Sequence, residues 1–307
     1  MLSEVKCLDQ YVSKRAAIYH GDTCEVIRAI PTASVAYTIF SPPFASLYTY
    51  SNSERDLGNV KDDEEFFGHL AFLTREMLRI TKPGRLLSFH CMLMPTSKER
   101  DGYIGLRDFR GDLIRAFQAA GWIHHSEVVI WKDPVTAMQR TKALGLLHKT
   151  VRENASMSRQ GIPDYLITMR APGEVPRDER VRHTAEEYPV DWWQRVASPI
   201  WTDIDMQDTL QYQSAREHDD ERHICPLQLE VIRRGIELWT APDETVFTPF
   251  LGIGSEAWIA LGGATRSGKK LAPRRAVGCE LKASYYAQAV RNVREAELDR
   301  QASLFAV

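Results

Sequence analysis

The hydrophobic positions in the first part of the chain alternate between short runs typical of strands and longer stretches with helical spacing. Residues 16–20 predict a short strand, a helical stretch follows from Thr23 to about Ile30, and Val35–Phe40 is rich in β-branched and aromatic residues, as a buried strand is. Between Asp62 and Ile80 apolar residues recur at helical spacing, behind four acidic residues that suit a helix N-terminus. This part of the chain therefore predicts alternating strands and helices.

The alternation continues beyond this helix and returns in the last third of the chain. Strands are predicted over Arg85–His90 and Ser126–Trp131, with a helix near residues 110–120 between them. In the last third, the predicted elements are a helix over 227–239, a strand over 245–248, a helix over 252–261, a strand that ends at Glu280 and a helix over 284–297. Strands that alternate with helices predict an α/β fold with a doubly wound sheet.

Regularity fails between about residues 133 and 220. The segment mixes prolines and charged residues with Trp192, Trp193 and Trp201, as an inserted recognition module does. We therefore predict three parts, residues 1–132, 133–220 and 221–307, in which the first and third form the sheet and the second is an insertion. The tryptophans suit a core or a subunit interface better than a base-stacking surface.

Composition narrows the class of protein. The chain has 307 residues, 44% of them hydrophobic, which is enough for one large α/β domain with an insertion. Its five cysteines are odd in number, widely spread and without a CxxC pair, so neither a disulfide framework nor a zinc ribbon is expected. No run of eighteen apolar residues occurs, and we expect a soluble, cytoplasmic protein. The net charge of -2 limits any nucleic-acid affinity to a local surface.

One candidate ligand site is a glycine loop. The segment Phe250-Leu251-Gly252-Ile253-Gly254 follows a predicted strand and precedes a predicted helix, and the acidic Glu280 ends the next strand. Glycines let a ligand approach the backbone, and a carboxylate accepts hydrogen bonds from two ribose hydroxyls, so this pattern predicts a nucleoside site. The third glycine of a dinucleotide fingerprint is missing, which disfavours pyrophosphate. The alternative is a tight strand-to-helix turn without a ligand.

A second candidate site is Ser41-Pro42-Pro43-Phe44, directly after the buried strand over Val35–Phe40. Open α/β folds hold ligands at such carboxyl ends of strands. The Ser41 hydroxyl and the Pro42 carbonyl can each accept a hydrogen bond from an exocyclic amine and aim its lone pair at an electrophile. Two prolines fix the backbone in advance, and Phe44 can stack on a base. The alternative is a diproline that ends the strand, with Phe44 in the core.

These two motifs, in this order, resemble the β group of amino-DNA methyltransferases. In that permuted family the SPP[YF] or DPPY catalytic motif comes first, a target-recognition region follows and the FxGxG cofactor motif comes last. The resemblance covers roughly residues 17–131 and 222–292. It implies a circularly permuted, Rossmann-like methyltransferase fold that binds S-adenosylmethionine, with residues 1–132 as the catalytic half, 133–220 as the target-recognition insertion and 221–307 as the cofactor half.

The resemblance also implies roles for individual residues. Ser41, Pro42, Pro43 and Phe44 match the catalytic motif. On the cofactor side, Asp22 matches the group near the adenine, and Glu280 matches the acid at the ribose. The segment His223 to Leu227, with Pro226, matches the part beside the methionine, and Phe250, Gly252 and Gly254 match the loop. There is one departure. Thr248 stands where the family often has an aspartate, and Asp205 and Asp208 are too remote in sequence to replace it.

Methylation of a base amine requires the base to leave the stack, so we expect double-stranded DNA as the partner and a basic surface to hold it. Residues 135–170 carry six cations against two acids. The residues expected at DNA are Arg140, Lys142, Lys149 and Arg152 in this stretch, and Tyr48 and Arg55 in the loop after the serine motif. An ordinary solvated face and a disordered loop are the alternatives.

Several alternatives stay open at this point. Ser in the first motif position is commoner among cytosine-N4 enzymes, but adenine-N6 methylation is the commoner activity overall and is slightly favoured. Cytosine C5 chemistry is disfavoured because it needs a nucleophilic Cys after Pro, and only Cys225 before Pro226 is available. His223 and Cys225 lack further ligands for a metal. An RNA or small-molecule methyltransferase and a catalytically silent nucleic-acid-binding module are rivals, and a homodimer is expected from the resemblance.

Overall fold

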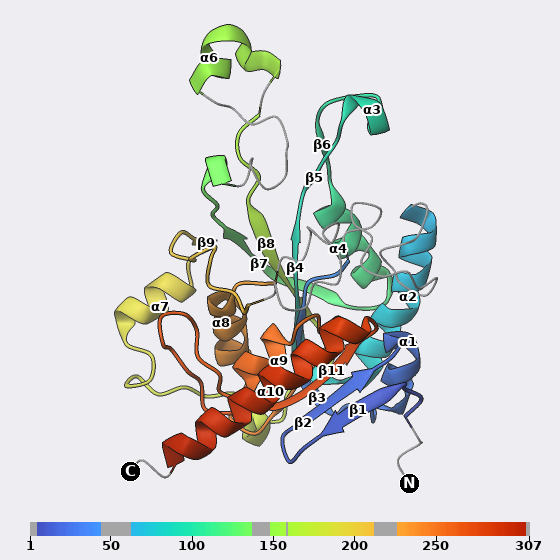
Figure 1. Ribbon diagram of the computed structural model, residues 1–307, viewed down its shortest axis with the longest axis vertical. Helices are drawn as coiled ribbons and strands as arrows, with labels where there is room; N and C mark the ends of the chain where they lie inside the picture. The colour runs from blue at the N-terminus through green and yellow to red at the C-terminus, as the bar shows by residue number, and fades with distance from the viewer. Residues whose placement is uncertain (1–4, 44–62, 137–147, 158, 212–225, 305–307) are drawn as a thin grey trace.

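The computed structural model describes residues 5–43, 63–136, 148–157, 159–211 and 226–304. Its centre is a nine-stranded sheet with helices on both faces (Figure 1). The order of strands across the sheet is β1-β2-β11-β10-β3-β4-β8-β7-β9. Their bounds are β1 Asp9–Val12, β2 Ala16–His20, β3 Val35–Phe40, β4 Thr81–Met92, β7 Ile123–Ile130, β8 Asp164–Arg170, β9 Ile200–Trp201, β10 Thr245–Thr248 and β11 Arg275–Glu280.

The middle of the sheet is parallel. Strands β2, β11, β10, β3 and β4 run the same way, β8 is antiparallel to both β4 and β7, and β1 is antiparallel to β2. Although β3 and β10 are about 200 residues apart, Tyr37 of β3 pairs with Val246 of β10. Parallel strands end at one edge of a sheet, so the segments that follow β3 and β10 lie side by side.

Helices cover both faces and confirm the doubly wound α/β fold. On one face lie α8 (Leu229–Trp239), α9 (Ser255–Ala260) and α10 (Ala283–Leu304). On the other lie α1 (Thr23–Val26) with the short helix η1 (Ile27–Ala29), α2 (Asp63–Ile80) and α4 (Phe109–Ala119). The side chains of β3 alternate between the two cores, since Tyr37 and Ile39 pack with α8 and α9 while Phe40 packs with α2 and α4.

Close packing of α8 against β3 depends on a glycine. A Cβ atom on Gly235 would lie 2.8 Å from the Tyr37 hydroxyl and 3.1 Å from the Ile39 side chain. Because real Cβ atoms do not approach so closely, a larger residue there would force the Tyr37 side chain or the helix to shift.

The segment 133–220 contains more regular structure than its sequence predicts. Strand β8 lies between β4 and β7 in the main sheet, with Ile167 and Met169 fully buried, and Trp201 in β9 is also buried. The prolines before and after β8 concealed a continuous apolar run, which is what a strand buried on both faces requires. The prediction that this whole segment lacks regular elements is therefore wrong, because β8 belongs to the sheet. The boundaries of the three parts stay predictions.

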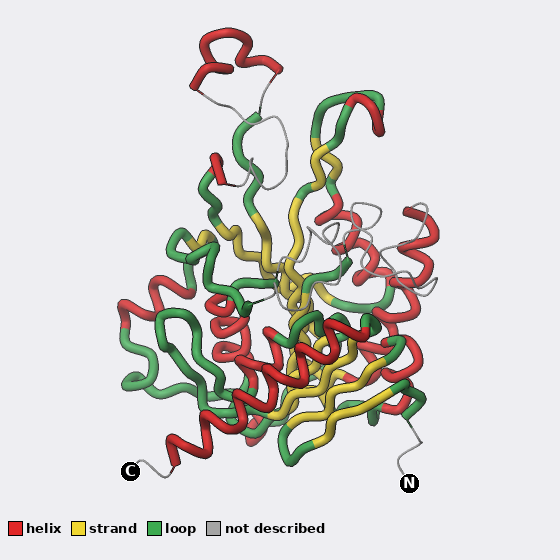
Figure 2. The backbone as a smooth tube through the Cα atoms, viewed as in Figure 1, coloured by secondary structure: helices red, strands yellow, loops and turns green. Residues whose placement is uncertain are grey.

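Two projections extend from the end of the sheet at which β4 finishes (Figure 2). One is the hairpin of β5 (Met94–Pro95) and β6 (Leu106–Arg107) with α3 (Lys98–Asp101), and the other carries α6 (His148–Asn154) with η3 (Ala155–Met157). The remaining elements, η4 (Arg177–Glu179) and α7 (Val190–Val196), lie beside the sheet. Within the described ranges, no helix is long and apolar enough to span a bilayer.

Candidate active site

The glycine loop joins β10 to α9. Gly252 and Gly254 have φ angles of +55° and +90°, a region that residues with a Cβ atom avoid. At Gly254 the reason is packing as well, because a Cβ there would lie 3.2 Å from the Cα of Ala289 in α10. At Gly252 a Cβ would meet nothing within 4 Å. The loop is thus packed against the protein at one glycine and has open space beside the other.

Glu280 holds this loop in place. One of its carboxylate oxygens accepts a 2.7 Å hydrogen bond from the backbone N–H of Gly252, and the other accepts a 2.9 Å bond from the N–H of Lys282. These two bonds fix the Glu280 carboxylate against the start of the loop. The predicted glycines and the predicted acid are therefore brought together in one unit.

Asp22 lies at the same edge, one strand further along. Residue His20 at the end of β2 pairs with Glu280 at the end of β11, and the Gly21 N–H donates to the carbonyl of Glu280 at 2.9 Å. The carboxylate of Asp22 caps α1 by accepting a 2.9 Å hydrogen bond from the N–H of Cys24. The carboxyl ends of β2, β11 and β10 thus carry Asp22, Glu280 and Gly252 in order.

A buried acid, Glu256, follows the loop in the first turn of α9. Burial, with a smaller contribution from the nearby charge of Glu280, raises the pKa of Glu256 to about 8. Its carboxyl group is therefore neutral at neutral pH, which avoids the cost of a buried unpaired charge. The sequence prediction did not single out this residue.

Ser41, Pro42 and Pro43 follow β3, directly beside the glycine loop. Both prolines are buried and Ser41 is half-buried. Phe40, the last residue of β3, packs against Phe250 of the loop with ring centroids 5.7 Å apart. The two motifs, at opposite ends of the sequence, therefore share one edge of the sheet and one aromatic contact.

Three residues that the sequence prediction missed extend from Ser41 into the protein. The Ser41 hydroxyl lies 3.2 Å from Nδ1 of His90, which is near the end of β4. Nε2 of His90 is 2.9 Å from the carboxylate of Asp164, and Nζ of Lys132 is 2.5 Å from its other oxygen. The Asp164 carboxylate therefore lies between the His90 ring and the Lys132 ammonium group, with one oxygen close to each.

Asp164 is charged despite its burial. Burial by itself raises its pKa, but the positive charge of Lys132 and then the neighbouring His90 ring, with their polar contacts, lower it below the ordinary value overall. A carboxylate that is only 1% exposed needs such partners to stay ionised. One signal could have found this group: His90 and Lys132 stand at the ends of predicted strands, as Ser41 does.

The N-terminus of α8, just after Pro226, is occupied by another acid. Pro226 is half-buried, and Gln228 makes no capping bond with its side chain. Instead, one oxygen of Asp208 accepts from the N–H of Glu230 at 3.1 Å, and the other accepts from the N–H of Arg266 at 2.7 Å. Burial raises the pKa of Asp208. This acid therefore has a structural role at the helix, near the segment predicted to lie beside the methionine moiety.

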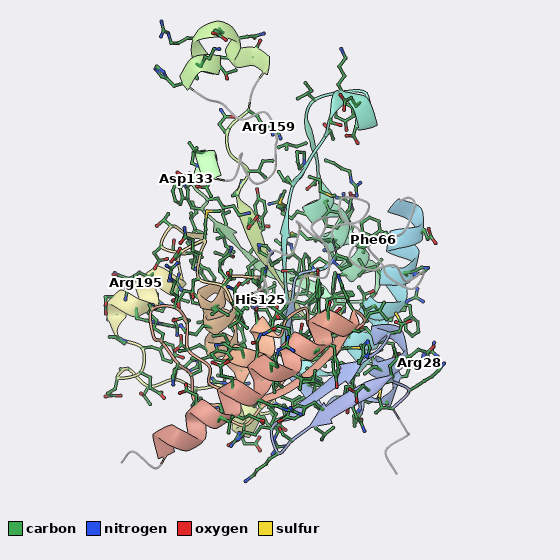
Figure 3. All side chains as sticks on the ribbon, viewed as in Figure 1. Arg28, Phe66, His125, Asp133, Arg159 and Arg195 are labelled. Carbon is green, nitrogen blue, oxygen red and sulfur yellow. The ribbon has the colours of Figure 1, made fainter. Side chains whose placement is uncertain are left out.

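Several predicted residues cannot be placed. Phe44, Tyr48, Arg55, Arg140, Lys142 and His223 lie outside the described residues. The two remaining DNA candidates, Lys149 and Arg152, are exposed on α6. Nζ of Lys149 is 3.8 Å from Oε1 of Glu153 on the same helix. Figure 3 places Asp133 and Arg159 along the same projection, away from α10. No group of acids, histidines and cysteines in the described ranges could hold a metal.

Comparisons of the fold agree with this arrangement. A proposed DNA modification methylase of Thermus thermophilus superimposes with a TM-score of 0.63 and 22% identity, covering 92% of this chain and 96% of that one. A structure of that methylase complexed with S-adenosyl-L-methionine gives a TM-score of 0.62 and 23% identity with the same coverage. The cytosine-N4-specific PvuII DNA methyltransferase gives a TM-score of 0.60 and 14% identity, covering 92% and 87%.

At such identities the structural similarities establish the fold and no more. No protein of curated function matches the sequence significantly. The sequence model of the DNA methylase family N6_N4_Mtase, however, matches residues 35–291, which include β3 and the serine motif as well as the glycine loop and Glu280. Because this match covers most of the chain and confirms the resemblance seen in its motifs, the protein belongs to this DNA methylase family.

Proposed function

We propose that this protein transfers a methyl group from S-adenosylmethionine to an exocyclic amino nitrogen of a flipped-out base in double-stranded DNA. The observation that carries the proposal is the meeting of two motifs at one edge of the sheet. Ser41 and Pro42 follow β3, Gly252 follows β10, and the rings of Phe40 and Phe250 touch between them. An amine at the first motif and a nucleoside cofactor at the second would be neighbours.

The cofactor side fits S-adenosylmethionine. The carboxylates of Glu280 and Asp22 suit ribose and adenine groups that donate hydrogen bonds, and the space beside Gly252 lets a ligand lie against the backbone. Bound there, the cofactor supplies an electrophilic methyl group on a positively charged sulfur. The protein's own contribution is to fix the direction of approach, because Gly254 and Ala289 pack the loop firmly against α10.

The serine side suits an amine. An exocyclic amine is a poor nucleophile because its lone pair is delocalised into the ring. Acceptors at the Pro42 carbonyl and the Ser41 hydroxyl would draw its hydrogens, free the lone pair and favour the positive charge that develops on nitrogen. The two buried prolines hold these acceptors in place before the base arrives. We propose Phe44 as the residue that stacks on the base.

DNA would approach the edge from which both projections extend. Exposed Lys149 and Arg152 on α6, together with Arg140, Lys142, Tyr48 and Arg55, are the proposed DNA contacts. We propose a homodimer from the family resemblance alone.

Adenine N6 is the proposed target, on the grounds that this activity is the commoner one in the family. Cytosine N4 is the alternative, because the same two acceptors serve either exocyclic amine.

Expression in a host without DNA methylation tests the proposal. The wild-type protein should introduce a methylated adenine or an N4-methylated cytosine at one sequence context, detected by sequencing the host genome for modified bases. Phe44→Ala should abolish the mark while the purified variant still binds S-adenosylmethionine. A folded wild-type protein that binds the cofactor but leaves no mark would favour the silent nucleic-acid-binding module, and C5-methylated cytosine would contradict the chemistry.

A further inference from the structure

Ser41, His90, Asp164 and Lys132 form a series of polar contacts, here called the polar chain, that links four separate segments of the sheet. Ser41 follows β3, His90 is in β4, Asp164 begins β8 and Lys132 follows β7. The contacts run from the Ser41 hydroxyl to Nδ1 of His90 at 3.2 Å, from Nε2 of His90 to Asp164 at 2.9 Å, and from Asp164 to Lys132 at 2.5 Å. Ser41 is half-buried and lies at the proposed active site, and Asp164 is the most buried of the four residues.

Such a chain is costly to build, and packing alone does not require it. A carboxylate taken out of water loses several kcal/mol of solvation unless charged partners compensate. Two residues before His90 on the same strand, Ser88 shows the cheaper solution, because its hydroxyl is paired with that of Thr168 on β8 at 2.8 Å without any charge. Interior positions of β4 and β8 are thus filled by a neutral pair, whereas the pair at the active-site end is ionic.

The position of Asp164 determines which nitrogen of His90 carries the proton. A carboxylate beside Nε2 favours the tautomer with hydrogen on Nε2, and Lys132 keeps that carboxylate ionised. Nδ1 then has a free lone pair directed at Ser41. In that tautomer the Ser41 hydroxyl, 3.2 Å away, would donate its hydrogen to Nδ1, which would leave its oxygen lone pairs for an incoming amine. In the opposite tautomer, Nδ1–H would occupy one of those lone pairs.

We propose that His90, oriented by Asp164, is a positioning residue that makes Ser41 a hydrogen-bond acceptor and receives a proton from it. The inference rests on the proposed function. As the amine lone pair forms the bond to the methyl carbon, the carbon–sulfur bond breaks and its electron pair stays on sulfur. The proton that the positively charged nitrogen then sheds passes to the Ser41 oxygen, while the Ser41 hydrogen passes to Nδ1 of His90.

Atoms and charge balance in this step. The products are a neutral methylated amine, a neutral thioether, an unchanged Ser41 and an imidazolium that faces Asp164. The single positive charge that entered on sulfur is then on His90, from which water takes the proton.

The first test uses the protein without cofactor. Nitrogen-15 NMR of the histidine side chains, assigned by the signal lost in His90→Asn, should show His90 as the neutral tautomer with hydrogen on Nε2. In Asp164→Asn the preference for that tautomer should weaken. A tautomer with hydrogen on Nδ1 in the wild-type protein would overturn the proposal, whether or not the protein proves to be a methyltransferase.

The second test uses single-turnover methyl transfer to duplex DNA at saturating cofactor. His90→Asn and His90→Ala should each slow the transfer on the order of 100-fold, as loss of an acid–base group does, with cofactor affinity unchanged. The double variant Ser41→Ala with His90→Ala should be no slower than the slower single variant, because both act through one hydroxyl. Ser88→Ala, the matched buried control on the same strand, should stay within about twofold of wild type.

These outcomes separate the two proposals. Three outcomes would show that His90 is structural, even if the protein methylates DNA. They are a double variant whose rate loss is the product of the two single losses, a His90→Asn protein with the wild-type rate, and a rate loss in Ser88→Ala as large as that in the His90 variants. Absence of methyl transfer by the wild-type protein would instead refute the proposed function, and the tautomer measured by NMR would still decide whether Asp164 orients His90.

Discussion

The two ends of the candidate active site are built in opposite ways. At the glycine-loop end, the carboxylate of Glu280 holds the backbone N–H groups of Gly252 and Lys282, and Gly254 fits against Ala289. At the serine end, geometry is set by side chains that reach across four segments, from Ser41 through His90 and Asp164 to Lys132. One end is a backbone cradle and the other is a polar chain.

The two ends also differ in how they carry buried acids. Glu256 beside the glycine loop has a raised pKa and is neutral, whereas Asp164 at the serine end has a lowered pKa and is ionised between Lys132 and His90. The difference follows from the partners available, because Glu256 faces another acid and Asp164 faces Lys132 and His90. Changes in pH should therefore weaken the two ends in opposite directions.

The largest expected effect is on stability at the glycine-loop end. Since the pKa of Glu256 rises from 4.5 to about 8 on folding, its contribution is fully present below pH 4.5 and is lost as pH rises to about 8. The loss is roughly 1.4 kcal/mol per pH unit within that window. Glu256→Gln should remove this slope, as measured by urea unfolding at pH 5 and pH 8. A slope equal to that of wild type would mean that Glu256 is ionised in the folded protein.

The opposite dependence is expected from Asp164. Because its pKa is lowered on folding, it stabilises the protein above the ordinary value of 3.8, and that stability is lost as pH falls through the lowered value. The free energy of unfolding of the wild-type protein should therefore fall more steeply with decreasing pH below pH 5 than that of Asp164→Asn. An identical pH dependence in the two proteins below pH 5 would contradict the ionised state of Asp164.

The next effect is on chemistry at the serine end. Ser41→Ala removes one acceptor for the amine and should lower the rate of methyl transfer on the order of 100-fold, by analogy with loss of one group that stabilises a developing charge. Affinity for S-adenosylmethionine, measured by calorimetry, should not change, because Glu280 and Gly252 are untouched. A large loss of cofactor affinity in this variant would show that the two ends are not separate.

The reciprocal change is Glu280→Ala. It removes two charge-assisted hydrogen bonds from the loop and should weaken cofactor binding by roughly 10-fold to 100-fold, while the rate at saturating cofactor falls far less. Asp108→Ala is the control, because Asp108 caps α4 by accepting from the Gly111 N–H at 3.0 Å. It should cost about 1 kcal/mol of stability and leave cofactor affinity as it is.

The smallest effect is expected away from both ends, on α6. Replacing Lys149 and Arg152 together by Ala should make the plot of the logarithm of DNA affinity against the logarithm of salt concentration less steep. The change should correspond to the loss of up to about two phosphate contacts. Cofactor affinity and stability should not change, since both side chains are exposed. An unchanged slope would place the DNA surface elsewhere.

Most of the fold could be predicted from the sequence, because hydrophobic residues recur with regular spacing in most of its strands and helices. The predicted strands over 16–20, 35–40 and 245–248 coincide with β2, β3 and β10. Strand β8 was missed because Pro163 and Pro172 flank a short apolar run within an irregular segment. The partners that make this run a strand are β4 and β7, which lie earlier in the chain, and a local pattern carries no information about them.

The residues of the candidate site likewise fall into those that a local motif reveals and those that only the fold brings together. Gly252 and Gly254 form a continuous motif, and Ser41 to Phe44 form another, so each could be recognised locally. His90, Lys132 and Asp164 come from three distant segments and meet only because β4, β7 and β8 are neighbours in the sheet. Asp164 counts in the sequence only as one negative charge in a basic stretch, and its burial between Lys132 and His90 is a property of the fold.

The most direct test of the central claim is nucleoside analysis of DNA methylated in vitro. Purified protein would be incubated with unmethylated duplex DNA and S-adenosylmethionine that carries an isotope-labelled methyl group, and the digested DNA would be analysed by mass spectrometry. We predict the label on N6-methyldeoxyadenosine or N4-methyldeoxycytidine and its loss in Ser41→Ala. Label on 5-methyldeoxycytidine, or no labelled nucleoside from a protein that binds both cofactor and DNA, would contradict the claim.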